Sequence, residues 1–92
     1  MAMDWATSNE FDRIMRDGDW HYSKADSYEH LGYYGDARNH YYYAMHSYQD
    51  AERLASSHDD YKKYDALSKY NYCRSKFSEM SSKGYDEPRN RY

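Results

Sequence analysis

Apolar and small residues recur at helical spacing along most of the chain, and no stretch alternates at the period of two that is typical of a half-buried strand. The clearest pattern is a stripe whose spacing alternates between four and three: Ala37, Tyr41, Ala44, Tyr48, Ala51 and Ala55. This alternation places all six side chains on one face of a helix. It predicts a helix that is capped by Asp36 and runs to about Ser56.

A second stripe repeats the same spacing later in the chain: Ala66, Tyr70, Cys73, Phe77 and Met80. It predicts a helix that starts at Asp59 or Asp60, runs to about Lys83 and is ended by Gly84. The remainder, residues 85–92, is expected to be a polar tail.

Two further elements are expected before Asp36. Thr7 and Glu10 fit a capping box, which predicts a short helix that Gly18 ends. Asp19 then caps a second helix that ends between Gly32 and Gly35. Its expected inward positions are Tyr22, Ala25, Tyr28 and Leu31. The fold class is therefore all-α: residues 1–84 form a single domain, a compact bundle of three main helices preceded by a short one.

The amino-acid composition limits which residues can form the core of this bundle. The chain holds 14 tyrosines, one isoleucine, three leucines and no valine, so its core must consist of tyrosine, alanine and methionine. A buried tyrosine needs a partner for its hydroxyl, and tyrosines that stay at the surface suit contacts with other proteins. This composition indicates a binding surface.

Cys73 is the only cysteine, which excludes an intramolecular disulfide and a cysteine-rich zinc site. The simplest compartment is a reducing cytoplasm. Because Cys73 lies in the middle of the second stripe, we expect a buried structural thiol and not a nucleophile. No apolar stretch approaches the roughly 18 residues of a membrane span, so no membrane partner is expected.

Charge is distributed unevenly along the chain. Residues 1–60 hold five lysines and arginines against twelve acids, whereas residues 61–92 hold eight against four, so a net charge of −7 is followed by +4. Helix faces of opposite sign would attract each other within one fold. The same charges could also bind charged partners, or they could pair two copies of the chain as a homodimer.

One family pattern is visible. Tyr28, Leu31 and Gly32, followed by Ala44, Tyr48 and Ala51, resemble the signature of a tetratricopeptide repeat. The resemblance covers about a third of the chain and one repeat. It departs at Gly35, where the family prefers an aromatic residue, and at Ser56, where it commonly has proline. The resemblance implies a helical hairpin that packs through alanine and tyrosine, and a role in protein interaction.

The first candidate site lies on the side of the predicted Asp36–Ser56 helix opposite its stripe. Four side chains follow one another there at spacings of four, three and four: Tyr42, His46, Gln49 and Arg53. Tyrosine and arginine are enriched at the energetic centres of protein interfaces. These residues are either scattered on a solvated surface or form a strip that faces a protein partner; we expect the strip to bind.

The second candidate site lies on the last predicted helix, where aromatic and basic residues alternate: Tyr61, Tyr64, Tyr72, Lys62, Lys69 and Arg74. Aromatic rings stack on unpaired bases while positive charge follows the phosphate backbone, so single-stranded nucleic acid is the alternative partner. A helix whose lysine stems cover tyrosine rings explains the same residues without a ligand.

No catalytic, cofactor or metal signature is present. The five histidines show no HExxH or ExxH spacing, and His46 with Asp50 supplies only two ligands from one helix face. We therefore expect a cofactor-free, non-enzymatic protein that inhibits or adapts a larger protein or protein–nucleic acid complex. In size, acidity and lack of motifs the chain is similar in type to the small inhibitors that phages and mobile elements direct at bacterial defence complexes, including anti-CRISPR proteins.

Overall fold

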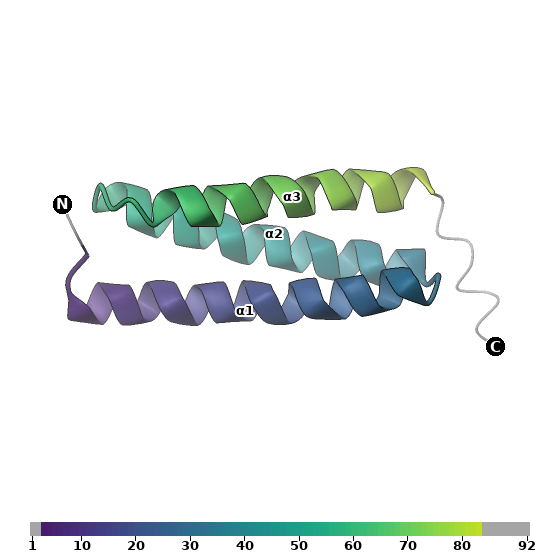
Figure 1. The fold of residues 1–92 in the computed structure, drawn as a ribbon, viewed down its shortest axis with the longest axis horizontal. Helices are drawn as coiled ribbons and strands as arrows, with labels where there is room; N and C mark the ends of the chain where they lie inside the picture. Colours follow the sequence, from purple (N-terminus) through teal and green to yellow (C-terminus); the bar gives the residue numbers. More distant parts are fainter. Residues whose placement is uncertain (1–2, 84–92) are drawn as a thin grey trace.

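The computed structural model describes residues 3–83, which form three helices: α1 (Trp5–His30), α2 (Tyr34–Ser57) and α3 (Lys63–Ser82). No strand occurs in this part of the chain. α1 and α3 run in the same direction, and α2 runs antiparallel to both, behind the plane that they share (Figure 1). α2 packs closely against each of the other two helices. The predicted all-α bundle is confirmed.

α1 is continuous through Gly18, so the predicted break between a short helix and a second one is wrong. Its N-cap is Asp4, whose Oδ1 accepts a hydrogen bond of 2.8 Å from the backbone N–H of Thr7. Gly18 lies buried in the middle of the helix. A Cβ atom at this position would stand 2.7 Å from Cε1 of Tyr48 on α2. The glycine therefore allows two helices to approach closely and does not end one.

The turn between α1 and α2 is short. α1 ends at His30, and Gly32 adopts a φ of +82° that favours glycine. Leu31 was expected to point inward but is exposed, because it follows the end of the helix. α2 begins at Tyr34, so Asp36 lies within its first turn and is not the cap.

α3 begins at Lys63, later than Asp59 or Asp60, because Asp59 takes a φ of 52° that interrupts helical geometry. Asp60 instead binds two backbone N–H groups through its carboxylate, from Lys62 at 2.8 Å and from Met3 at 3.1 Å. Its carboxylate thereby holds Met3 against the turn between α2 and α3. Gly84 and the expected tail, residues 85–92, lie outside the described residues.

The core confirms the α2 stripe, since all six of its residues are fully buried. Alanines let the helices approach, and the two tyrosines fill the space beside them. Both buried hydroxyls reach carboxylates of α1: Tyr41 donates to Glu29 at 2.7 Å and Tyr48 to Asp19 at 2.5 Å. Burial, together with these carboxylates, raises the pKa of both tyrosines. Of the α3 stripe, Ala66, Cys73 and Met80 are buried and Tyr70 and Phe77 are partly buried.

Long side chains join α1 to α3. Lys76 donates to Glu29 at 2.7 Å, and Lys69 lies 3.4 Å from Asp19. The acidic first part of the chain and the basic last part therefore attract each other within one molecule, as one interpretation of the charge distribution predicted.

Candidate functional site

A series of aromatic and imidazole rings in mutual contact runs from α1 over α2 to α3. We call it the aromatic belt; its members are Trp20, His21, His40, Tyr43, Tyr42, His46 and Phe77. Trp20 of α1 meets His21 edge to face with ring centroids 4.9 Å apart. Tyr42 lies 4.5 Å from His46 on its own helix and 5.6 Å from Phe77 on α3. The belt thus links α1 to α3 across the surface of α2.

The belt is large and accessible. Trp20 is 55% exposed, Tyr43 50% and Tyr42 41%, although each ring also contacts other rings. Amphipathic rings that are held in place by neighbours lose little conformational freedom when a partner covers them. Tryptophan and tyrosine are the residues most enriched at the energetic centres of protein interfaces. The belt therefore has the chemistry of a protein-binding surface.

Two histidines stand at the centre of the belt. Nδ1 of His21 and Nδ1 of His40 are 3.0 Å apart, so one ring must carry a proton on this atom and the other must accept it. Burial, together with the nearby His21 and Lys24, lowers the pKa of His40, while Asp36 acts weakly in the opposite direction. The neutral imidazole of His40 is therefore the favoured form in the fold.

The first predicted site falls partly within the belt. Tyr42 and His46 belong to it, whereas Gln49 and Arg53 follow on later turns of α2, with Gln49 half-buried and Arg53 exposed. The spacing of residues along the chain did not identify the contributions of α1, which are Trp20 and His21. Both lie in the predicted helix that begins at Asp19, outside its expected inward positions, and their contacts with α2 depend on how the two helices pack.

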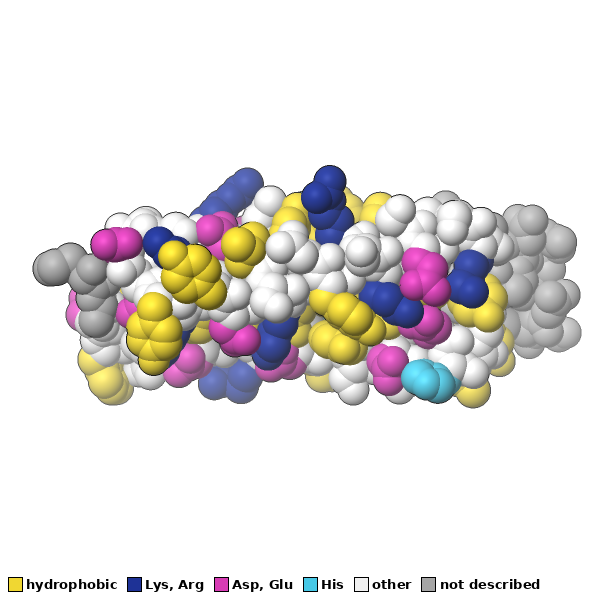
Figure 2. Space-filling model, turned by 45° about the horizontal axis from the view of Figure 1, so that its top comes forward, with side chains coloured by type: hydrophobic (Ala, Val, Ile, Leu, Met, Phe, Trp, Pro, Cys, Tyr) yellow, Lys and Arg dark blue, Asp and Glu magenta, His cyan; other side chains and the backbone are white. Residues whose placement is uncertain are grey.

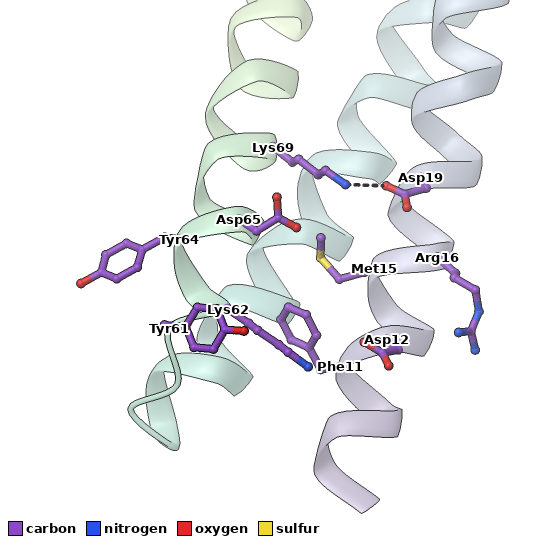
Figure 3. A pocket seen from close by; sticks show the side chains of 10 residues that line it. All are labelled: Phe11, Asp12, Met15, Arg16, Asp19, Tyr61, Lys62, Tyr64, Asp65 and Lys69. Carbon is purple, nitrogen blue, oxygen red and sulfur yellow. Dashed lines mark hydrogen bonds and ion pairs between the residues drawn. The ribbon is translucent and has the colours of Figure 1, made fainter. Parts of the chain in front are cut away.

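A second surface is a groove of about 650 Å³ between the first half of α1 and the start of α3. We call it the α1–α3 groove (Figure 3); it is lined by Phe11, Asp12, Met15, Arg16, Asp19, Tyr61, Lys62, Tyr64, Asp65 and Lys69. Phe11 and Met15 are buried in its floor. Tyr61 is 77% exposed and Tyr64 64% at its edge. Space-filling representation shows hydrophobic side chains at this end of the molecule interspersed with charges of both signs (Figure 2).

The groove contains as many acids as bases. Asp12, Asp19 and Asp65 stand against Arg16, Lys62 and Lys69. Lys69 is already paired with Asp19, and Nζ of Lys62 donates to the hydroxyl of Ser8 at 3.3 Å. A surface that follows a phosphate backbone needs an excess of positive charge, and this groove has none.

The residues of the second predicted site are divided by the structure. Tyr61, Lys62, Tyr64 and Lys69 line the groove together. Tyr72 lies further along α3, where its ring stacks on Tyr22 of α1 at 5.4 Å. Arg74 borders a separate shallow hollow with Asn71, Ser75 and Ser78. The predicted set therefore does not form one continuous platform.

No protein-family model, curated protein or solved structure matches this chain. The helical hairpin that the resemblance to a tetratricopeptide repeat implied is present as α1 and α2, with Ala44, Tyr48 and Ala51 buried.

Cys73 is buried, as the second stripe predicted. Burial raises the pKa of the Cys73 thiol to about 12, which keeps it protonated near neutral pH. Residues 3–83 contain no group of three or more metal-ligating side chains. Within the same range, none of the helices combines the length and apolar character that crossing a lipid bilayer requires.

Proposed function

We propose that this protein is a non-enzymatic protein-interaction module that binds its partner through the aromatic belt. The observation that supports the proposal is the half-exposed rings of Trp20, Tyr43 and Tyr42. Tyr42 lies against Tyr43, and Trp20 and Tyr43 both contact His21, so the three rings are linked across two helices. Each ring combines a large apolar surface with one group that can form hydrogen bonds, which suits a surface that faces water when no partner is bound.

Within this class, we propose an inhibitor or adaptor of a larger macromolecular complex, of the type that phages and mobile elements use against bacterial defence systems. The support is a single small domain with a net charge of −3 and a surface suited to binding. Such a protein acts by occupying a surface of its partner and needs no chemistry of its own.

The test begins with affinity purification and mass spectrometry, followed by titration of the purified partner. Trp20→Ala and Tyr43→Ala are each expected to weaken binding by more than about 1 kcal/mol, as truncation of a central interface residue does. Trp5→Ala is the matched control, because Trp5 is exposed and belongs to neither the belt nor the groove. Melting curves of each variant separate lost binding from lost stability. Equal affinity of all three variants would exclude the belt as the binding surface.

Single-stranded nucleic acid is the second candidate partner, because the exposed rings of Tyr61 and Tyr64 lie beside Lys62 and Lys69. Affinity for an oligonucleotide would fall steeply with salt as counterions are released, whereas an aromatic protein interface would respond less. A salt titration therefore distinguishes the two partners.

A further inference from the structure

Two histidines of the aromatic belt face each other through the same atom. Nδ1 of His21 on α1 and Nδ1 of His40 on α2 are 3.0 Å apart, and the centroids of the two rings are 5.2 Å apart. A hydrogen bond at this distance needs one proton between the two nitrogens. One imidazole therefore carries its proton on Nδ1 and the other carries it on Nε2, so the contact fixes opposite tautomers. We call these two residues the histidine pair.

The histidine pair tolerates one additional proton but not two. A first proton can bind the unprotonated Nε2 of the donor ring, and the Nδ1–H of the resulting imidazolium still donates to the neighbouring ring. A second proton has only the accepting Nδ1 to bind. Two N–H groups then point at each other, and two positive charges lie on adjacent rings. The doubly protonated pair must therefore separate.

The charges around the histidine pair decide when the second proton enters. Burial lowers the pKa of His40, the neighbouring His21 and Lys24 lower it further, and Asp36 of α2 acts in the opposite direction. Asp17, which lies one turn before His21 on α1, already accepts a hydrogen bond of 2.7 Å from a hydroxyl of α2. From α3, Lys69 and Lys76 are paired with carboxylates of α1. These surroundings favour the neutral pair, so the second proton enters only on acidification.

The histidine pair joins the α1 part of the belt to the α2 part. Trp20 of α1 contacts both imidazoles, with ring centroids 4.9 Å from His21 and 5.9 Å from His40. Tyr43 of α2 also contacts both, at 5.3 Å and 6.2 Å. Separation of the pair therefore changes how Trp20 and Tyr43, two half-exposed rings of the belt, are held relative to each other.

We propose that the histidine pair is a proton-operated switch of the aromatic belt. The belt is assembled while the pair holds at most one additional proton, and a second proton separates its α1 rings from its α2 rings. The consequence for binding rests on the proposed function, because it concerns a partner that recognises the assembled belt. The switch itself is a property of the free protein and can be measured without any partner.

The first test is a pH titration of the imidazole nitrogens of the full-length protein by ¹⁵N NMR. Near neutral pH, His21 and His40 are expected to show opposite tautomers. Acidification should then give two separated protonation steps, because the charge added in the first step opposes the second. Identical tautomers, or two independent steps at the ordinary histidine pKa of about 6.5, would overturn the proposal.

The second test uses Trp20 as a reporter of opening. Trp5→Phe leaves Trp20 as the only tryptophan. Its rate of quenching by acrylamide should rise at the second protonation step toward the rate of Trp5 in a Trp20→Phe protein, since Trp5 is 81% exposed. In the Trp5→Phe background, His40→Gln should remove this step and His46→Gln should retain it. An unchanged quenching rate would overturn the proposal, and so would a simultaneous loss of helical circular dichroism, which would mean that the whole protein unfolds.

The third test measures the affinity of the purified partner from affinity purification. If only the assembled belt binds, the affinity of the wild type relative to His40→Gln should fall about tenfold for each pH unit below the second step. Comparison of the two proteins at each pH removes the partner's own titration. Parallel affinities would overturn the regulation of binding. Failure of the proposed function has a different signature: Trp20→Ala and Tyr43→Ala then bind as the wild type does, while the quenching step remains.

Discussion

At the scale of single residues, Gly18 decides how closely α1 and α2 approach. Glycine in the middle of a helix normally costs about 1 kcal/mol relative to alanine. Here the ring of Tyr48 occupies the space where a Cβ would be, and Tyr48 is fixed by full burial and by its hydrogen bond to Asp19. The missing side chain is therefore a packing requirement.

Gly18→Ala is consequently expected to destabilise the protein, although alanine is the better helix former. Overpacking costs about 1–3 kcal/mol and should exceed the gain of about 1 kcal/mol in helix propensity, leaving a net loss of up to about 2 kcal/mol. Urea denaturation measures the free energy of unfolding. Ser23→Ala, at an exposed position of α1, is the control and should stay within about 0.5 kcal/mol. A more stable Gly18→Ala protein would show that Tyr48 moves aside freely.

His40 makes stability depend on pH. Its pKa is lowered in the fold, while the unfolded chain titrates near about 6.5. As pH falls through that value the unfolded state binds more protons than the folded state, so stability decreases on acidification and returns as pH rises. A second proton would also set two N–H groups against each other across the 3.0 Å separation from His21.

Melting temperatures between about pH 7.5 and pH 5 should therefore fall less for His40→Gln than for the wild type. His46→Gln is the control, because His46 is exposed. Parallel curves for wild type and His40→Gln would show that the histidine pair does not contribute to the pH dependence.

At the scale of helices, α2 could be predicted almost completely from its sequence, and α1 could not. Alternating alanine and tyrosine defines one buried face of α2, and all six stripe residues are buried. Gly18 carries the same local signal as a helix stop, and only the position of Tyr48, 30 residues later, shows that it is a contact. The belt was incompletely predicted for a related reason, since Trp20 and His21 of α1 join it through contacts with His40 of α2, and such contacts between helices leave no pattern in the sequence.

The α1–α3 groove could be predicted from the sequence only in part. Its aromatic and basic residues near the start of α3 are close in sequence and were identified together, but Asp12 and Phe11 come from the other end of the chain. The residues of α3 alone have the aromatic and basic composition of a site for single-stranded nucleic acid. Together with the residues of α1 they form a groove that is neutral and has an apolar floor.

Ala44 tests the close packing of α2. It is fully buried in the middle of the stripe, so Ala44→Leu should overpack the bundle and cost about 1–3 kcal/mol. Thermal melting with the exposed control Asp50→Ala measures the difference. An unchanged midpoint for Ala44→Leu would mean that neighbouring side chains rearrange to admit it.

At the scale of the whole molecule, two contacts between opposite charges join α1 to α3, which lie in front of α2 (Figure 1). The two contacts are unequal. Lys76 and Glu29 are largely buried, 2.7 Å apart, and Glu29 also accepts from Tyr41. Lys69 and Asp19 are more exposed and 3.4 Å apart. Burial alone would raise the pKa of Glu29, but the hydrogen bonds from Lys76 and Tyr41 lower it.

This difference predicts unequal effects of removing the two lysines. Lys76→Met leaves a partly buried carboxylate with a weaker set of partners and should cost about 1.5–3 kcal/mol, the range for hydrogen bonds to charged groups. Lys69→Met removes an exposed pair and should cost at most about 1 kcal/mol. In about 1 M salt the effect of Lys69→Met should vanish while most of the effect of Lys76→Met remains, because buried pairs are screened less.

The lowered pKa of Glu29 adds a dependence on pH. The contribution of Glu29 to the free energy of unfolding should be present above the pKa of the unfolded state and lost as pH falls through the pKa of the folded state. Equal losses for the two variants would show that burial does not distinguish the two contacts.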